Sequence, residues 1–125
     1  MSYSLTGKVR LLTEVDQVDL GLDQAIPCGL ILNELISNAL KHAFPQGREG
    51  CISIRVEHND PVVSITISDD GIGLPGDFHD ERSANLGLQL VHTLIQQLDG
   101  SIDRSTAQGT RYTISFNIAQ PRVPA

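Results

Sequence analysis

The stretch IPCGLILNELISNALKHA occupies residues 26–43 and carries the clearest periodicity in the chain. Asp23 is a candidate N-cap for a helix, and Pro27 fits its first turn. Pro45 and Gly47 predict its end. Apolar residues recur at intervals of three and four, the spacing of one helix face. They are Cys28, Ile31, Leu32, Leu35, Ile36, Ala39, Leu40 and Ala43. We therefore expect an amphipathic α-helix that packs this face on a core.

Strand-like segments surround this helix. Apolar and polar residues alternate over residues 52–57, 63–68 and 110–118. Residues 101–105 are a further short strand candidate, and 9–12 a weaker one. Residues 58–61 predict a hairpin turn, and helical spacing returns over 87–98, where Asp99 and Gly100 close the segment. The expected order is strand, helix, hairpin, glycine-rich loop, helix, hairpin. We expect an α/β fold, a two-layer sandwich with helices on one face of a mixed sheet, and not a run of repeated βαβ units.

Chain length indicates the number of domains, and net charge argues against some classes of partner. A chain of 125 residues with 40% hydrophobic residues fits one domain, with a core over about 8–118 and a tail over 119–125. A net charge of -6 argues against binding to nucleic acid or to an anionic membrane surface. No segment suggests a membrane span or a signal peptide, so we expect a soluble cytoplasmic domain. Cys28 and Cys51 are expected to be free thiols.

The polar side of the expected helix has an unusual composition. Glu34, Asn38 and Lys41 lie at i, i+4 and i+7, so they line one face. A carboxylate, an amide oxygen and an ammonium group are the set that a magnesium-bound polyphosphate needs. The alternative is an ordinary exposed face with a hydrogen bond between Glu34 and Asn38 and a surface lysine.

Further candidate residues follow the second strand of the first hairpin. Period-two counting puts Asp69 on the apolar face, where its carboxylate either binds a ligand or opens a turn. Gly71 and Gly73 permit close approach of a flat ligand, or simply form turns. Gly87 begins the second helix, where free N–H groups favour an anion, although Asn85 as N-cap is an ordinary alternative. Because there is no GxxxxGK[ST] run, any phosphate site is not a P-loop.

Four segments taken in order resemble one family. They are residues 33–44 (NELISNALKHAF), 69–73 (DDGIG), 86–91 (LGLQLV) and 109–110 (GT). They are similar to the N box, G1 box, G2 box and terminal GT of the GHKL ATPase superfamily, and in particular to the catalytic ATP-binding domain of sensor histidine kinases. The resemblance implies the Bergerat ATP-binding fold. The N box and the short loop before the G2 box look most like kinases of the second HisKA or HWE type.

The resemblance also implies roles for the residues at the phosphate end of a nucleotide. Asn38 would ligate Mg²⁺ bridging the phosphates of ATP, and Glu34 would act as general base or polarise the attacking group. Lys41 would contact phosphate oxygens and serve catalysis, and His42 would contact phosphate as well. Gly87, with its neighbour Leu88, would admit the phosphates at the helix start.

At the adenine end, the resemblance implies that Asp69 accepts a hydrogen bond from the adenine amino group. Gly71 and Gly73 would let the backbone approach the base, and Thr110 would line the pocket near Asp69. Residues 74–86 would form a lid over the nucleotide.

The implied function is transfer of the ATP γ-phosphoryl group to a histidine on a separate helical dimerisation domain, and from there to the receiver domain of a response regulator. No phosphoacceptor histidine on a dimerising hairpin is evident here, so the isolated domain is expected to bind ATP and to turn over weakly. The alternatives are a serine kinase and anti-sigma factor of the same superfamily, or a nucleotide-binding regulatory module without transfer activity.

Overall fold

The computed structural model describes residues 2–4, 8–44, 48–72, 86–106 and 109–119. In these residues the chain forms six strands and two helices. Their bounds are β1 Ser2–Ser4, β2 Val9–Val15, α1 Leu22–His42, β3 Gly50–Asn59, β4 Val62–Asp69, α3 Leu86–Gln97, β5 Ser101–Ser105 and β6 Thr110–Asn117. The strands form one sheet in the order β1-β2-β3-β4-β6-β5.

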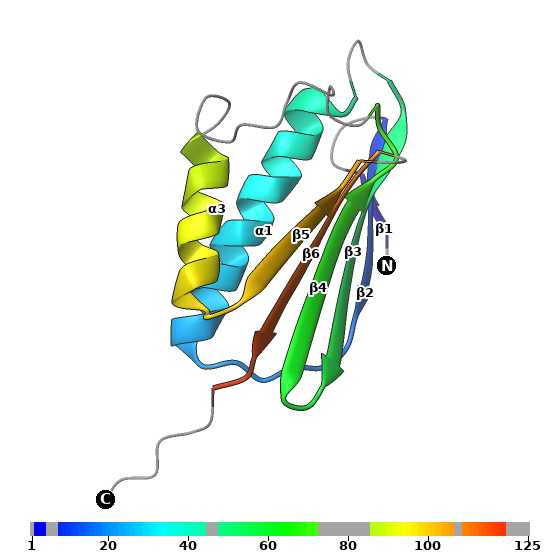
Figure 1. Ribbon diagram of the computed structural model, residues 1–125. Helices are drawn as coiled ribbons and strands as arrows, with labels where there is room; N and C mark the ends of the chain where they lie inside the picture. Colours follow the sequence, from blue (N-terminus) through cyan, green and yellow to red (C-terminus); the bar gives the residue numbers. More distant parts are fainter. Residues whose placement is uncertain (1, 5–7, 45–47, 73–85, 107–108, 120–125) are drawn as a thin grey trace, which may run out of the picture.

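The sheet is mixed and has two layers, as expected. Strands β2 and β3 are parallel and are joined through α1, whereas the other neighbouring strands are antiparallel. Both helices lie on one face of the sheet (Figure 1). The chain is therefore an α/β sandwich in which α1 connects the parallel neighbours β2 and β3, and α3 connects β4 to β5 on the far side of β6. This arrangement confirms the predicted fold class.

The predicted start of α1 is wrong. Gly21, in an extended conformation, is the N-cap, and no side chain caps the helix. Asp23 instead lies in the first turn, where a carboxylate is favoured by the positive end of the helix dipole. Pro27 lies inside the helix, beyond the first turn. It leaves the carbonyl of Asp23 without its usual helical donor, since proline has no N–H.

Two strand predictions need correction as well. The first strand runs on to Val15, because parallel pairing with β3 continues there. Strand β1, which pairs with residues 10–12 of β2, was not predicted. The hairpin turn is shorter than expected, since β3 includes His58 and Asn59 and leaves Asp60 and Pro61 as the turn. Register with β4 holds up to Asn59, so pairing overrode the weak strand propensity of asparagine.

The end of α3 confirms the predicted stop. Asp99 has a φ of 54°, and its N–H donates to the carbonyl of Gln96, while the N–H of Gly100 donates to the carbonyl of Ile95. These two bonds form a Schellman motif. Here an aspartate occupies the left-handed position, and glycine follows it because a Cβ on Gly100 would lie 2.6 Å from the carbonyl oxygen of Ser115.

The core lies between the two helices and the sheet. Alternate residues of β3, β4 and β6 face it, and α1 and α3 supply their apolar faces. The most deeply buried side chains are Ile31, Leu35, Ile52, Ile114, Val63 and Val91. Cys28 is a free thiol among them, and burial raises its pKa to about 11, so it is protonated and unreactive at neutral pH.

Gln24 is a buried polar residue that fastens the start of α1 to the end of β6. Its amide nitrogen donates to the carbonyl of Asn117 at 2.9 Å, and its amide oxygen accepts from the N–H of Ala119 at 3.0 Å. We expect Gln24→Ala to lower the free energy of unfolding by about 1–3 kcal/mol, because both backbone groups lose their partner. The control is Gln96→Ala, at an exposed position of α3. Equal urea midpoints for the two variants would contradict the role given to Gln24.

Candidate functional site

Four predicted segments meet at one end of the molecule. The C-terminal end of α1, the N-terminal end of α3, the end of β4 and the start of β6 all lie there (Figure 1). The N–H of Ile72 donates to the carbonyl of Ala43 at 3.1 Å, so the segment after β4 is bonded to the end of α1. Gly71 fits against this helix end because a Cβ would lie 2.5 Å from that of Ala43. The fold therefore brings together the motifs that the sequence singled out.

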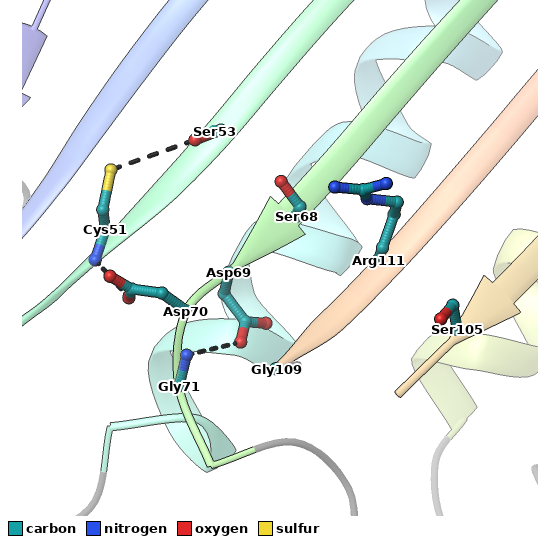
Figure 2. A pocket seen from close by; sticks show the side chains of 9 residues that line it. All are labelled: Cys51, Ser53, Ser68, Asp69, Asp70, Gly71, Ser105, Gly109 and Arg111. Carbon is teal, nitrogen blue, oxygen red and sulfur yellow. Dashed lines mark hydrogen bonds between the residues drawn. The ribbon is translucent and has the colours of Figure 1, made fainter. Parts of the chain in front are cut away.

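Asp69 is the buried acid of this region. It ends β4 opposite Ile52 and Thr110, and only 9% of its surface is exposed. Its Oδ1 accepts hydrogen bonds from the N–H of Gly71 at 3.0 Å and from the N–H of Thr110 at 3.3 Å (Figure 2). The position on the core-facing side of β4 confirms the period-two prediction.

The pKa of Asp69 reflects several opposing effects, of which the smallest is a lowering by the charge of Arg48. Burial raises the pKa of the carboxyl, the two backbone hydrogen bonds lower it, and the neighbouring Asp70 raises it further. Desolvation is the largest effect, so the pKa lies above its ordinary value. Both hydrogen bonds go to Oδ1, and within the described residues Oδ2 has no partner. Asp69 thus keeps one acceptor atom for which the described residues supply no donor.

Gly109 packs closely against Asp69. It has a φ of 76°, a conformation that side-chain-bearing residues rarely adopt. A Cβ at this position would collide with the backbone carbonyl oxygen of Asp69 and would lie 3.2 Å from its Oδ1. The sequence motif contained Gly109, but its own contribution was missed, because positive φ and close approach show only in three dimensions.

The polar residues of the N box lie in the last turns of α1. Glu34 and Asn38 are half-buried and Lys41 is exposed, and the unbroken helix confirms their common side. Glu34 and Asn38 are therefore less exposed than side chains on a freely solvated helix face. His42 is the last residue of the helix, and its side chain lies outside the described part of the structure.

The remaining site residues fall into two groups. Thr110 is buried beside Asp69, and Gly87 lies in the first turn of α3, both as the motifs require. Leu88 is 97% buried on the core face of α3, so a contact with phosphate could come only from its backbone. Gly73 and residues 74–85 of the predicted lid lie outside the described residues, whereas Leu86, the last residue of the predicted lid, begins α3.

Asp70 takes a structural position on the opposite face of the sheet. Its Oδ1 accepts a hydrogen bond from the N–H of Cys51 at 2.7 Å (Figure 2). This bond ties the end of β4 to the start of β3. The two adjacent aspartates therefore have different roles. Asp69 faces the helices, and Asp70 links the end of β4 to the start of β3.

A cavity of about 680 Å³ touches Asp69, Gly71 and Gly109. Its other walls include Ser53, Ser68 and Arg111 (Figure 2), which point away from the helices because they alternate with core residues. This cavity is therefore distinct from the space between α1 and Asp69. Among the described residues no group of three histidine, cysteine or acidic side chains could hold a metal ion, and no helix there has the length and hydropathy to cross a membrane.

Comparison with known proteins identifies the family. The sequence model of the histidine kinase-, DNA gyrase B- and HSP90-like ATPases matches residues 23–120. The chain belongs to this family. The match contains all four motifs and all the residues of the site described above.

Individual relatives include kinases. The chain is 41% identical over 95 residues to the sensor histidine kinase PdtaS of Mycobacterium tuberculosis, an alignment of 72% of this chain and 19% of that protein. The histidine kinase domain of the blue-light activated kinase EL346 from Erythrobacter litoralis superposes with a TM-score of 0.83 at 29% identity, covering 90% of this chain and 53% of that one. The anti-sigma F factor of Bacillus subtilis is 24% identical over 126 residues, covering 92% of this chain and 84% of that protein. The chain thus spans about a fifth of PdtaS and about half of the EL346 kinase domain.

Proposed function

We propose that this chain is the ATP-binding catalytic domain of a sensor histidine kinase, and that Asp69 recognises adenine. The observation that carries the proposal is the free Oδ2 of a buried carboxylate whose Oδ1 is already held by two backbone N–H groups. This oxygen can accept a hydrogen bond from a ligand, and the amino group of adenine is a donor of the right kind. Thr110, Gly71 and Gly73 would border the base.

The phosphate end of the site is proposed at the C-terminal turns of α1. Asn38 offers an amide oxygen, Glu34 a carboxylate and Lys41 an ammonium group on one side of the helix. This donor set suits a magnesium-bound polyphosphate, so Mg²⁺ fits the residues present. When bound, Mg²⁺ would neutralise charge on the phosphate oxygens. Lys41 would hold phosphate oxygens by charge, and His42, Gly87 and the backbone of Leu88 would complete the cradle.

We infer that this domain catalyses phosphoryl transfer mainly by positioning the reacting groups. Glu34 would orient or deprotonate the attacking group, and Lys41 would stabilise the charge that develops on the transferred phosphoryl group. The acceptor would be a histidine of a helical dimerisation domain, and the next acceptor a receiver-domain aspartate of a response regulator. The N box form favours a parent kinase of the second HisKA or HWE type, acting in the cytoplasm without direct membrane or nucleic-acid contact.

The second candidate is a serine kinase of the anti-sigma type. The alignment of 92% of this chain with the anti-sigma F factor of Bacillus subtilis supports it. Sequence identity favours the histidine kinase, at 41% against 24%. Phosphohistidine is acid-labile and phosphoserine is acid-stable. Acid treatment of a labelled partner therefore separates the two, and acid-stable label would replace our proposal with the anti-sigma function.

Asn38→Ala tests the phosphate end. With a reconstituted acceptor domain, we expect the variant to lose Mg²⁺-dependent phosphoryl transfer by about 100-fold or more, because it removes the oxygen that places the metal. Transfer is followed by radiolabel from [γ-³²P]ATP. The control is Asn33→Ala, an exposed amide of the same helix, which should keep transfer within about twofold. Unchanged transfer by Asn38→Ala would overturn the assignment of the metal ligand.

A further inference from the structure

The sheet has a second face, which neither helix covers (Figure 1). Strand register places one residue from each of five strands in a straight row across this face. The row consists of Leu12, Ser53, Ser68, Arg111 and Ser105. Its centre is therefore made of short hydroxyl side chains with one long cationic side chain standing among them.

Two cavities meet along this row. One, of about 680 Å³, lies toward Asp70 and Ser105, and the other, of about 590 Å³, lies toward Leu12 and Arg55. Both are lined by Ser53, Ser68 and Arg111. Together they form a trough across the sheet, which is hollow because the short serine side chains do not fill the space beside Leu12 and Arg111.

The two arginines of the trough differ in their partners. The Nε atom of Arg55 lies 3.3 Å from Glu57 and 4.0 Å from Glu14, so its charge is compensated. Arg111 has no ion pair or side-chain hydrogen bond within the described residues, and its guanidinium lies beside Ser68 (Figure 2). The hydroxyls of Ser68 and Ser105 also have no partner there. Arg111 and Ser68 are thus two neighbouring donor side chains on one cavity wall, and Ser105 lies on the other side of Arg111.

Four of the acids near this wall are already engaged, whereas Asp103, two residues before Ser105 on the same face of β5, has no side-chain partner within the described residues. Asp70 accepts the N–H of Cys51, Glu14 and Glu57 face Arg55, and Asp69 points to the helix side. A planar guanidinium flanked by hydroxyl donors matches a carboxylate or phosphate group, which accepts several hydrogen bonds at once. We propose that the trough holds an oxyanion site, with Arg111 as its charged contact and Ser68, its neighbour on the adjacent strand, as a hydrogen-bond donor.

Amide and arginine Nε–H NMR shifts test this site on the whole chain. Inorganic phosphate and an N-acetylated tetraglutamate peptide are the probes, and they separate a phosphoryl source from an acidic peptide. We expect saturable shifts centred on Ser68 and Arg111 for at least one probe, with Arg111→Gln weakening binding by about tenfold or more. The matched control, Arg55→Gln, removes an arginine that is already paired and should change binding by less than about twofold.

The proposal stands apart from nucleotide binding. Shifts centred on Lys41 and Gly87 would put the oxyanion in the nucleotide site and overturn the proposal. Non-saturating shifts, or equal binding by Arg111→Gln, would overturn it as well. The folded state of each variant is checked by its unperturbed core amide spectrum, so that a loss of binding is not a loss of fold.

Discussion

Asp69→Asn is expected to lower the affinity for ATP by about 10- to 100-fold, the value of one hydrogen bond to a charged group. Asparagine keeps the shape of the side chain, and its amide oxygen can still accept from Gly71 and Thr110. The atom that replaces Oδ2 is a donor and faces the amino group of adenine, which is also a donor. Isothermal titration calorimetry gives the affinity, and the same affinity in variant and wild type would contradict the role of Asp69.

The same variant is expected to keep or gain stability. Burial raises the pKa of Asp69 in the folded chain above its ordinary value of 3.8. Stability from this group is therefore fully present below pH 3.8 and is lost as the pH rises through the raised folded value. At neutral pH the ionised, buried carboxylate costs stability that asparagine does not, so we expect a gain of up to about 1 kcal/mol. If the stability of Asp69→Asn fell more steeply with rising pH than that of the wild type, the predicted direction of the pH effect would be wrong.

Gly109→Ala is expected to lower the free energy of unfolding by about 2–4 kcal/mol. A φ of 76° costs an L-residue about 1–2 kcal/mol. The added methyl also collides with the carbonyl of Asp69, and relief of the clash would move the N–H of Thr110 away from Oδ1. We therefore expect nucleotide affinity to fall together with stability.

Gly29→Ala is the matched control. Gly29 is exposed in α1, and nothing lies within 4 Å of the position of its Cβ. Alanine there should raise stability by about 0.5–1 kcal/mol, because glycine is the poorer helix former. Chemical denaturation compares the two variants. A Gly109→Ala variant as stable as the wild type would show that the contact with Asp69 is not tight.

Much of the fold followed from local patterns in the sequence. The i, i+3, i+4 spacing of residues 26–43 predicted α1, and alternation predicted the hairpin of β3 and β4. Boundaries were less accurate, because Gly21 begins α1 through backbone geometry and not through a capping side chain. The extension of β2 to Val15 depends on pairing with a strand that lies beyond a whole helix, which local patterns do not contain.

The site was predictable only where a residue conflicted with its element. Asp69 stood out as a charge on an apolar face, and the structure buries it as expected. Gly109 and Gln24 gave no such signal, since their importance comes from contacts with Asp69 and with Asn117 that are distant in sequence. Arg111 was not singled out because its free charge depends on which neighbours lie across the strands.

Recognition of adenine by the free oxygen of Asp69 is tested most directly by comparing two nucleotides. The chain is titrated in the calorimeter with a non-hydrolysable ATP analogue and with the matching inosine analogue, which lacks the amino group, each with and without Mg²⁺. We predict saturable binding of the adenine nucleotide, strengthened by Mg²⁺, and binding of the inosine nucleotide that is about tenfold weaker or more. Equal binding of the two nucleotides, or no binding at millimolar concentration, would contradict the account.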